Sequence, residues 1–456
     1  MTSASGSVAE RQHTVTVVGL GKVGLPLAVQ FADAGWQVVG ADVQADVVAL
    51  VGRGEVPFPG ERDLDRRLAD VIARGRLTAT IDTTEAVARS AVVVVVVPLI
   101  VDASARPDFT IIDAATAAVA AGVRPGTLVS YETTLPVGTT RTRLAPALAA
   151  GSGLGLGREL FVAMSPERVL TGRVFRDLAA YPKLVGGLDA ESARRAESFY
   201  RSVLTFDDRP DLHRPNGVWA VGNTDAAELI KLAETTYRDV NIALANTFAV
   251  HAESLGIDYD VIAQAANSQP YSRLHATGVA VGGHCIPVYP QLYLAGDPQA
   301  RLVQTAREVN LGMPAHVVAQ LVAAMDAHRL DLSGSRVVVL GAAYRGGVKE
   351  TAFSGVFPLV QLLHERGAVV TVHDPLFSDH ELAAHGLVAH HLGDSCQGAI
   401  VQADHDQYAV LSKDDLPGVR AIVDGRGITP DVGWDGVARI VLGAPSKSTI
   451  IPRAGG

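Results

Sequence analysis

The stretch Thr14-Val15-Thr16-Val17-Val18-Gly19-Leu20-Gly21-Lys22-Val23-Gly24 decides the fold expected for this chain of 456 residues. An apolar strand runs into a Gly-x-Gly-x-x-Gly turn, and helical periodicity follows over residues 23–34. The first two glycines permit a tight turn and let backbone approach a pyrophosphate, while the third lets the helix pack against the strand. The helix N-terminus offers its positive dipole end to that anion. The stretch therefore predicts a parallel α/β unit that binds a dinucleotide.

An acidic residue indicates which dinucleotide. Asp42 ends the second expected strand, residues 38–41, where a carboxylate binds the ribose hydroxyls and repels a 2′-phosphate. NAD is therefore favoured over NADP. The alternative is a structural glycine turn in an α/β fold that binds something else. If NAD binds, the expected contacts are Gly19, Leu20, Gly21, Val23, Gly24, Asp42, Pro98 and Thr134.

Strands and helices alternate outward from this turn. Alternation of this kind predicts parallel βαβ units in a doubly wound sheet. Residues 224–254 then show helical periodicity without Pro or Gly, which predicts a helix of about thirty residues, well above the usual length. Strand–helix alternation resumes at Ser335. The expected strands are residues 14–18, 38–41, 77–80, 91–97, 128–131, 160–163, 184–186, 336–340 and 369–373, with weaker signals at 408–411, 421–423 and 438–441; further helices are expected at 258–266, 297–328 and 354–366.

The expected architecture is thus two doubly wound α/β domains joined by a long central helix. We divide the chain into a flexible N-terminus at residues 1–13, an NAD-binding domain at 14–217, a helical middle at 218–332 and a second α/β domain at 333–456. The middle domain carries the Gly-rich loop around Cys285.

Composition excludes several classes of protein. Nearly half of the residues, 48%, are hydrophobic, which suits a globular core, and a net charge of −9 disfavours nucleic acid or anionic membranes as partners. Cys285 and Cys396 are the two cysteines, which fits a reducing cytoplasm. Residues 1–13 lack the apolar core of a signal peptide, and the apolar run at 91–97 is too short to span a bilayer. We expect a cytoplasmic protein without a metal.

Residues 278–294, Gly-Val-Ala-Val-Gly-Gly-His-Cys-Ile-Pro-Val-Tyr-Pro-Gln-Leu-Tyr-Leu, form the second informative stretch. Glycines let a substrate approach the backbone next to Cys285, and Pro287 stiffens the loop. A lone cysteine is more often a small buried hydrophobe, but this setting favours a catalytic thiol. Cys396 lies in a polar stretch without such a setting and is interpreted as structural or incidental.

The motif Gly-Gly-His-Cys-Ile-Pro at residues 282–287 resembles the active-site loop of the UDP-glucose/GDP-mannose dehydrogenase family. It is most similar to the branch that acts on UDP-N-acetylhexosamines. The resemblance runs from about Thr14 to beyond Arg426. Further matching motifs lie at residues 132–139, 165–169, 238–246, 310–314 and 340–344.

The resemblance implies an oxidation in two steps by NAD. The C6 alcohol of the sugar becomes an aldehyde, and Cys285 adds to it to form a thiohemiacetal. A second oxidation gives a thioester, which water hydrolyses. The thiol has a chemical reason: an sp2 aldehyde carbon is a poor hydride donor, and addition of sulfur restores an sp3 centre.

Roles for other residues follow from the same resemblance. Lys231 stabilises the developing alkoxide, with Thr235 on the same helix face, Glu167 is the base for water, and Thr134 positions that water. The structural alternatives are a solvated lysine, a carboxylate at a helix N-terminus and a turn hydroxyl, respectively. The residues implied in substrate binding are Glu167, Arg168, Lys231, Arg238, Asn241, Arg273, Gly282, Gly283, Tyr344 and Arg345. For Arg345 the alternative is a solvated loop cation.

Three positions depart from the family pattern. Thr235 replaces an asparagine, Tyr289 replaces an aspartate four residues after the cysteine, and Ala352 stands in place of an arginine. The first two departures bear on thioester hydrolysis, since tyrosine is neutral at pH 7, and the third bears on phosphate binding.

The sequence therefore predicts an NAD-dependent 6-dehydrogenase for UDP-N-acetylmannosamine or UDP-N-acetylglucosamine. The alternatives are a UDP-glucose 6-dehydrogenase, a non-catalytic protein that binds nucleotide sugar or NAD, and a two-electron β-hydroxyacid dehydrogenase, which needs no thiol. The resemblance further implies that residues 333–456 bind the UDP-sugar, that the chain forms a homodimer or larger homo-oligomer through the central helix, and that it serves polysaccharide or glycoconjugate synthesis.

Overall fold

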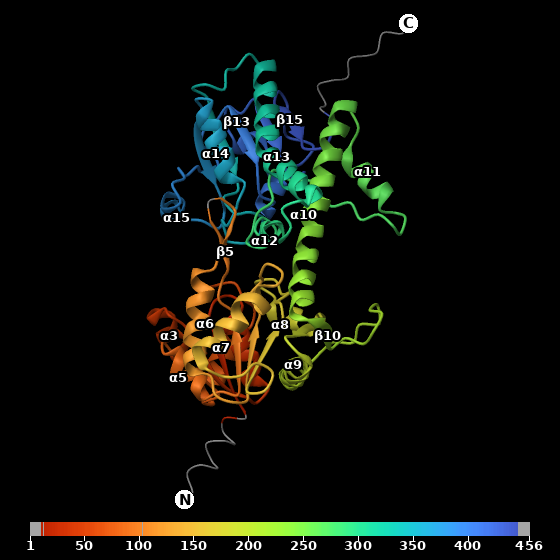
Figure 1. Ribbon diagram of the computed structural model, residues 1–456. Helices are drawn as coiled ribbons and strands as arrows, with labels where there is room; N and C mark the ends of the chain where they lie inside the picture. Colours follow the sequence, from red (N-terminus) through yellow and green to blue (C-terminus); the bar gives the residue numbers. More distant parts are fainter. Residues whose placement is uncertain (1–10, 12, 103, 446–456) are drawn as a thin grey trace, which may run out of the picture. The chain divides into compact units, whose positions relative to one another are not determined.

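The computed structural model describes residues 11, 13–102 and 104–445 (Figure 1). Contacts group the chain into two units. Unit 1 comprises Met1–Glu234 with Gln291–Gly296, and unit 2 comprises Thr235–Pro290 with Asp297–Gly456. Each unit is described by itself below.

Among the described residues, unit 1 is built on an eight-stranded sheet in the order β10-β9-β8-β7-β4-β1-β2-β3. Neighbouring strands pair in parallel, except that β9 runs antiparallel to β8. The expected doubly wound sheet is thus confirmed, with two strands, β9 and β10, that run opposite to the other six. Most of these strands are apolar and buried because helices cover both faces. Their bounds are β1 Thr14–Val18, β2 Gln37–Ala41, β3 Leu77–Thr80, β4 Val92–Val95, β7 Thr127–Tyr131, β8 Leu160–Met164, β9 Lys183–Gly187 and β10 Val218–Asn223.

The helices of unit 1 begin with α2, which follows the glycine turn directly. Leu25, Leu27 and Phe31 of α2 are buried in the same core as Val15 and Val17 of β1. A short antiparallel hairpin, β5 Ile100–Val101 with β6 Pro107–Asp108, projects after β4. The helices are α2 Gly24–Asp33, α3 Ala45–Gly52, α4 Leu64–Ala73, α5 Thr83–Ala88, α6 Thr110–Gly122, α7 Ala145–Ser152, α8 Val174–Ala180 and α9 Ala190–Val203, with a π-helical turn η1 at Thr140–Leu144.

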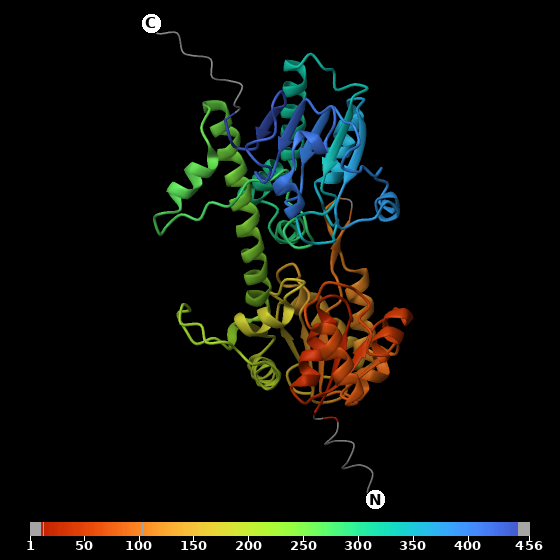
Figure 2. The ribbon, with the colours of Figure 1, turned by 180° about the vertical axis from the view of Figure 1, so that it is seen from behind.

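Within its described residues, unit 2 contains a five-stranded sheet that is parallel throughout, in the order β12-β11-β13-β14-β15 (Figure 2). The chain order reverses between β11 and β13, and such a switch point is where open α/β sheets bind ligands at their carboxyl edge. The elements are β11 Arg336–Leu340, β12 Val369–His373, β13 Gly398–Val401, β14 Ala421–Asp424 and β15 Ala438–Val441, with helices α11 Tyr259–Ala266, α13 Arg301–Ala327, α14 Val356–Glu365 and α15 Asp379–Ala384.

The long helix α10 spans Thr224–Leu255, 32 residues, and begins at the residue expected from the sequence. It starts in unit 1 and continues into unit 2. Gly256 then adopts a φ of 67°, a left-handed conformation typical of the residue that ends a helix. The shorter α12, Tyr289–Gly296, follows the cysteine loop.

One expectation about a single element was wrong, and some observed strands were not expected. Residues 408–411 do not form a strand: Asp406–Val410 is a 3-10 helix, η2, because Tyr408 turns inward and its hydroxyl donates to the carbonyl of His373. The strands β10 and β13 were not expected. In β13, Gly398 and Ala399 weaken the apolar signal, and β10 is a partly exposed edge strand. No helix in the part of the chain described is both long and apolar enough to cross a membrane.

Candidate active site

The glycine turn of unit 1 has the geometry that a dinucleotide requires. A Cβ on Gly24 would lie 1.9 Å from the carbonyl oxygen of Gly19. Only glycine at position 24 therefore lets α2 lie this close to the turn. Gly19 adopts a φ of 97°, which also favours glycine. A Cβ on Gly21 would meet no heavy atom within 4 Å, so its surface is open to a ligand. The turn therefore fits the pyrophosphate of NAD at the start of α2.

Asp42 is held at the carboxyl end of β2, beside this turn. Its Oδ2 accepts a hydrogen bond from Leu20 N at 2.8 Å, and its Oδ1 accepts one from Gln44 N at 2.9 Å. The carboxylate is half-buried. It is thus fixed in position while part of it faces solvent, as recognition of ribose hydroxyls requires. The residues present therefore fit the cofactor expected from the sequence.

Thr134 and Pro98 follow the carboxyl ends of two neighbouring strands, β7 and β4. The hydroxyl of Thr133 donates to the carbonyl of Val97 at 2.6 Å, which ties the two segments together. Thr134 is buried and Pro98 is exposed. Because parallel strands end at one edge of the sheet, these residues and the glycine turn share that edge.

Glu228 anchors the turn after Thr134 to helix α10. Its carboxylate accepts hydrogen bonds from Gly138 N at 2.6 Å, from Thr140 N at 2.8 Å and from the hydroxyl of Thr140 at 2.6 Å. Burial raises the pKa of Glu228 to about 7, although these donors oppose the shift. Lys231 lies one turn further along α10 and is buried. A solvated surface lysine, the alternative weighed for Lys231, is therefore wrong. Thr235, the next residue on that helix face, is buried as well.

Glu167 lies in a loop after β8 that forms no helix, so a carboxylate at a helix N-terminus is not its role. Its Oε1 accepts hydrogen bonds from Arg168 N at 2.6 Å and Val169 N at 3.1 Å, and its Oε2 lies 3.1 Å from Nζ of Lys183. The Arg168 guanidinium pairs with Glu234 of α10 at 2.5 Å. Arg168 is therefore already bonded within unit 1, and a substrate phosphate would have to compete with Glu234.

Sequence reasoning missed Glu132, Lys183 and Tyr200, which lie behind Glu167. Lys183 Nζ donates to Glu132 Oε2 at 2.5 Å, and the hydroxyl of Tyr200 donates to Glu132 Oε1 at 2.7 Å. Lys183 also lies over the Tyr200 ring, 5.0 Å from its centroid. The available signal was a lysine that opens the otherwise apolar strand β9, Lys-Leu-Val-Gly-Gly.

In unit 2 the cysteine loop packs against Tyr344. A Cβ on Gly282 would lie 2.5 Å from Cβ of Tyr344, and one on Gly283 would lie 3.2 Å from its ring. Gly283 has a φ of 85° and donates its N–H to the carbonyl of Ala352 at 2.8 Å. The structure thus brings together three predicted substrate residues, and Ala352 contributes through its backbone, where its methyl side chain is irrelevant.

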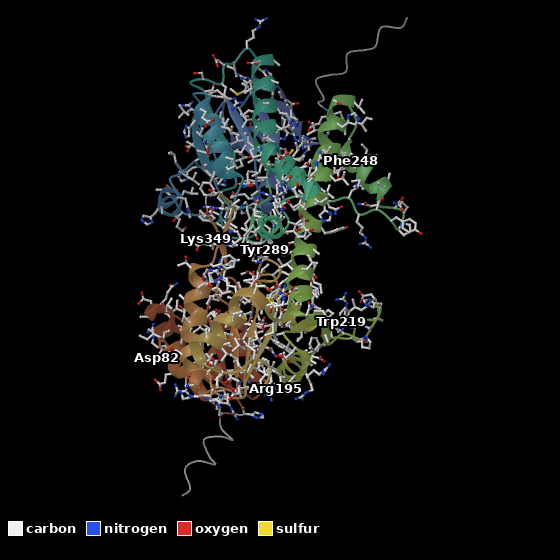
Figure 3. All side chains as sticks on the ribbon, viewed as in Figure 1. Asp82, Arg195, Trp219, Phe248, Tyr289 and Lys349 are labelled. Atoms are coloured by element: carbon white, nitrogen blue, oxygen red, sulfur yellow. The ribbon has the colours of Figure 1, made fainter. Side chains whose placement is uncertain are left out.

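Cys285 is half-buried, whereas its neighbours Ile286 and Val288 are buried. Its carbonyl accepts the N–H of Tyr289 at 2.9 Å, where α12 begins (Figure 3). A thiol of this kind is held in place and still accessible to an electrophile. His284 is exposed, with Nε2 3.6 Å from the carboxylate of Glu350. Cys396 is buried, and burial raises the pKa of its thiol to about 12, which agrees with a structural role.

A buried chain of amides holds the start of the cysteine loop. Asn246 of α10 accepts the N–H of Gly278 at 3.1 Å and donates to Oδ1 of Asn310 at 3.0 Å. Asn310 of α13 donates to Oδ1 of Asp239 at 2.9 Å, and Arg307 donates to the same oxygen at 2.7 Å. Two members, Asp239 and Asn246, belong to the motif at residues 238–246. These two residues of the motif therefore support the structure of the loop.

In the described part of unit 2, four other predicted substrate residues, Arg238, Asn241, Arg273 and Arg345, form no hydrogen bond or ion pair with the cysteine loop, residues 278–294. Arg238 and Arg273 are exposed, and the amide of Asn241 donates to the carbonyl of Tyr237 on its own helix at 2.8 Å. Arg345 is exposed, with its Nε 3.3 Å from the hydroxyl of Tyr344. Their roles in substrate binding stay predictions.

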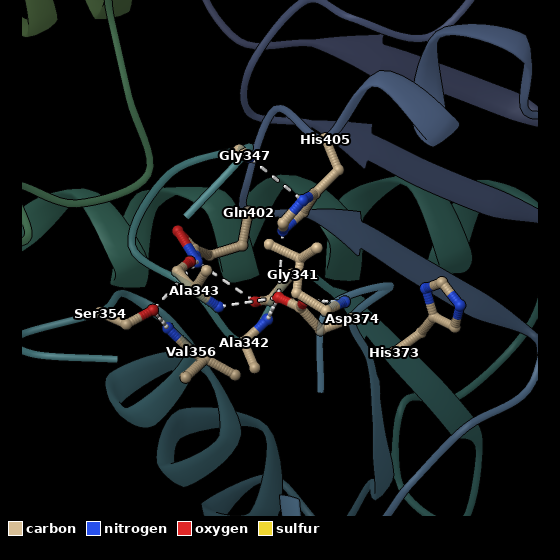
Figure 4. A network of polar contacts seen from close by, with 12 residues as sticks. Gly341, Ala342, Ala343, Gly347, Ser354, Val356, His373, Asp374, Gln402 and His405 are labelled. Carbon is tan, nitrogen blue, oxygen red and sulfur yellow. Dashed lines mark hydrogen bonds and ion pairs between the residues drawn. The ribbon is translucent and has the colours of Figure 1, made fainter. Parts of the chain in front are cut away.

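The turn after β11 is closed by a polar network (Figure 4). Oδ2 of Asp374 accepts hydrogen bonds from Ala342 N at 2.8 Å and Ala343 N at 2.9 Å, and it lies 3.1 Å from Nε2 of His405. The amide of Gln402, after β13, donates to the carbonyl of Ala343 at 2.6 Å and to the hydroxyl of Ser354 at 3.0 Å. The polar groups at the switch point of the second sheet are thus hydrogen-bonded to one another within the protein.

Family models match three segments of the chain. They describe the NAD binding domain of the UDP-glucose/GDP-mannose dehydrogenase family at residues 13–204, its central domain at 225–311 and its UDP binding domain at 338–431. The chain belongs to this family. The dehydrogenase therefore uses NAD, and the alternative of a glycine turn that binds something else is wrong.

Relatives of the dehydrogenase cover nearly its whole length. The UDP-N-acetyl-D-mannosamine dehydrogenase of Pyrococcus horikoshii is 33% identical over 428 residues, 92% of this chain and 97% of the relative. A solved structure of the Pyrococcus horikoshii UDP-D-ManNAc dehydrogenase matches with a TM-score of 0.84 at 30% identity, covering 94% of this chain and 99% of that one. An NDP-N-acetyl-D-galactosaminuronic acid dehydrogenase from Methanosarcina mazei matches with a TM-score of 0.80 at 27% identity, covering 97% and 98%.

These matches confirm the family inferred from the motifs. They identify the dehydrogenase as an NAD-dependent enzyme on nucleotide sugars, with a domain for UDP in unit 2. A merely binding protein and a β-hydroxyacid dehydrogenase are both set aside by this membership.

Proposed function

We propose that the dehydrogenase oxidises the C6 hydroxymethyl group of a UDP-N-acetylhexosamine, UDP-N-acetylmannosamine or UDP-N-acetylglucosamine, to a carboxylate, with Cys285 as the covalent nucleophile. The observation that carries this proposal is the half-buried Cys285 in a loop whose Gly282 and Gly283 pack against Tyr344. The N-acetylhexosamine is supported by the name of the Pyrococcus horikoshii relative, a UDP-N-acetyl-D-mannosamine dehydrogenase, and by the similar solved structure of the UDP-D-ManNAc dehydrogenase from the same organism.

NAD, when bound at the Gly19–Gly24 turn, supplies the hydride acceptor for both oxidations. After the first, the sulfur of Cys285 adds to the aldehyde carbon, a C–S bond forms and the carbonyl oxygen gains a proton. The thiohemiacetal carbon again carries a hydrogen on an sp3 centre, so a second oxidation would remove this hydrogen as hydride and the hydroxyl hydrogen as a proton, leaving a thioester.

Hydrolysis completes the reaction. Glu167 removes a proton from water as its oxygen attacks the thioester carbon, the C–S bond breaks and the thiolate of Cys285 departs. Lys231 stabilises negative charge on the sugar oxygen, since its ammonium is buried and a charge interaction is stronger where water is scarce. Thr134 and Thr235 serve as hydroxyl partners for water and for the oxyanion.

The decisive experiment counts NADH per sugar across UDP-N-acetylmannosamine, UDP-N-acetylglucosamine, UDP-glucose and GDP-mannose. We expect two NADH and one uronate per UDP-N-acetylhexosamine. Cys285→Ala should abolish uronate formation, while Cys396→Ala is the matched control because its thiol is buried and unreactive. A Cys285→Ala variant that still makes uronate contradicts the proposal, and turnover of UDP-glucose alone selects that alternative substrate.

We further propose that the dehydrogenase is a homodimer formed through α10. Large apolar side chains recur along the unit 2 part of this helix at the spacing of one face, and Figure 3 marks Phe248 among them. Their exposed fractions are 53% for Tyr237, 40% for Leu244, 40% for Phe248 and 58% for Leu255. A single chain has a mass of 47.7 kDa, and light scattering should give twice that value. Phe248→Glu should shift the protein toward monomer. A wild-type monomer contradicts this proposal.

The cytoplasm and the synthesis of surface polysaccharide or glycoconjugate are the proposed setting. Both follow from the uronate product, which is a precursor activated by UDP. Deletion of the gene should deplete the uronic acid from surface glycans, and fractionation should find the enzyme with the cytoplasmic proteins.

A further inference from the structure

Glu132, Glu167 and Lys183 form a buried carboxyl cluster at the edge of the unit 1 sheet. Glu132 directly follows β7, Glu167 lies in the loop after β8, and Lys183 is the first residue of β9. These three strands are neighbours in the sheet. Lys183 Nζ lies 2.5 Å from Glu132 Oε2 and 3.1 Å from Glu167 Oε2. The exposed fractions of the three side chains are 0% for Glu132, 11% for Glu167 and 5% for Lys183.

The charges in this cluster do not balance if every group is ionised. Two carboxylates against one ammonium leave a net charge of −1 in a site that solvent barely reaches, and burial of an uncompensated charge is costly. The guanidinium of Arg168, the residue that follows Glu167 in the chain, pairs with Glu234 at 2.5 Å. Tyr200 contributes a neutral hydroxyl, since burial raises its pKa well above the ordinary value. One proton shared by the two carboxyls makes the cluster neutral.

Hydrogen bonding decides which carboxyl holds the proton. Glu167 accepts two backbone N–H groups, from Arg168 and Val169, and donors of this kind stabilise a carboxylate. Glu132 accepts from Lys183 and from the Tyr200 hydroxyl, and it is hydrogen-bonded to Glu167. Glu132 is also the more deeply buried of the two. The proton therefore belongs on Glu132, from which it is donated to Glu167.

The pKa shifts agree with this assignment. Burial raises the pKa of Glu132 to about 8, more than Lys183 lowers it, and the charge of Glu167 adds to the rise. Burial also raises the pKa of Glu167, but Lys183 and the donors from Glu132 and Arg168 outweigh it, so the net shift is downward. The ammonium of Lys183 keeps its proton because the carboxyl groups outweigh its own burial.

We propose that Glu132 is a neutral carboxylic acid at neutral pH and that, together with Lys183, it holds Glu167 ionised and oriented as the base for thioester hydrolysis. Glu132 and Lys183 are positioning residues, because they act through Glu167. This inference rests on the proposed function only for the role of Glu167 as base. The protonation of Glu132 is a property of the protein without any substrate.

The first test measures Glu132 directly in the substrate-free protein. Infrared spectra of the wild type and of Glu132→Gln are subtracted at pH 6.5. We expect a C=O stretching band of a protonated carboxylic acid that is lost in the variant, and that disappears from the wild type as the pH rises through about 8. Absence of such a band at pH 6.5 overturns the proposal, whatever the enzyme catalyses.

The second test uses Glu132→Gln and Lys183→Met in the full enzyme with NAD and the accepted UDP-sugar. Gln copies the neutral acid, so hydrolysis at pH 7 should stay within about threefold of the wild type. Lys183→Met removes the ammonium, so the acidic limb of the hydrolysis pH profile should move to higher pH by about one unit or more. The covalent adduct on Cys285, followed by intact mass, should persist longer in that variant.

These outcomes separate the two proposals. If Glu132→Gln loses hydrolysis as completely as Lys183→Met, then Glu132 acts as a charged partner of Lys183 and the inference fails. If the wild type forms no NADH with any nucleotide sugar, the proposed function fails, while the infrared result still decides the state of Glu132. If Lys183→Met does not fold, the infrared band and the Glu132→Gln rate decide the matter.

Discussion

The two sheets carry equivalent turns with different roles. Each turn follows the first strand of its unit, each has a glycine with positive φ, 97° at Gly19 and 109° at Gly341, and each faces an aspartate at the end of the second strand. In unit 1, Asp42 is half-buried and accepts one N–H of the turn. In unit 2, Asp374 is buried and accepts two, beside His405.

The difference lies in what remains available to a ligand. In unit 1 the helix α2 begins at Gly24, directly at the turn, so the positive end of its dipole lies where a pyrophosphate would bind. In unit 2 the helix α14 begins only at Val356, and the N–H groups of Ala342 and Ala343 are already used by Asp374. The glycine turn after the first strand is therefore suited to bind a nucleotide in unit 1, whereas in unit 2 its N–H groups are hydrogen-bonded within the protein. A sequence motif alone thus does not define a binding site.

Gly24→Val should have the largest effect on this comparison. The added side chain would begin 1.9 Å from a backbone oxygen, so we expect unit 1 to lose more than about 4 kcal/mol and NAD binding to vanish. Gly341→Val is the counterpart, since its Cβ would lie 2.4 Å from Cβ of Ala403. It should destabilise unit 2 and leave NAD affinity in unit 1 unchanged. Urea unfolding and calorimetric NAD titration measure both, and NAD binding by Gly24→Val would break the comparison.

Asp42→Ala should weaken NAD binding by about 10- to 100-fold, because a charged acceptor of two ribose hydroxyls is lost. The relative affinity for NADP should rise, since the carboxylate no longer repels a 2′-phosphate. Fluorescence titration with both cofactors is the measurement. An unchanged ratio of the two affinities would show that Asp42 does not contact the ribose.

Asp374→Asn should leave NAD affinity intact and destabilise unit 2 in a pH-dependent way. Burial raises the pKa of Asp374, but His405 and the N–H groups of Ala343 and Leu376 outweigh it, so the folded pKa is depressed. A depressed pKa contributes stability above the unfolded value of about 4, which is lost as the pH falls through the folded value. Thermal unfolding between pH 7 and pH 3 should show this loss in the wild type and a flatter profile in the variant.

Gly21→Ala should have the smallest effect. A Cβ there meets no heavy atom within 4 Å, so the free energy of unfolding should change by less than about 1 kcal/mol. NAD affinity should fall by about 5-fold or less, because the methyl group occupies space that the pyrophosphate approaches. A gain in affinity would indicate that the cofactor does not approach this face of the turn.

Most of the fold could be predicted from the sequence where periodicity is strong. The strands β1, β3 and β11 and the start of α10 were expected at their observed residues, because continuous apolar runs and uninterrupted helical spacing leave few alternatives. Strand β13 was missed since it is short and begins with Gly398, and η2 was mistaken for a strand because its apolar residues point to a local turn rather than a sheet.

The site was predictable only where a motif is contiguous. Gly282, Gly283 and Cys285 stand together in the sequence, so their loop could be identified directly. Glu132 and Lys183 are 51 positions apart, and only the order of the strands in the sheet brings them together. That order depends on how the strands pair across the sheet, which the local sequence does not encode.

The amide chain behind the cysteine loop has a direction. Asn310 must donate to Asp239, so it can offer only its oxygen to Asn246, which in turn can offer only its oxygen to Gly278. An aspartate at position 246 would place a carboxylate oxygen against the side-chain oxygen of Asn310, and neither atom could donate a hydrogen bond. We therefore expect positions 246 and 310 to covary among homologues, because a change at one position requires a matching change at the other.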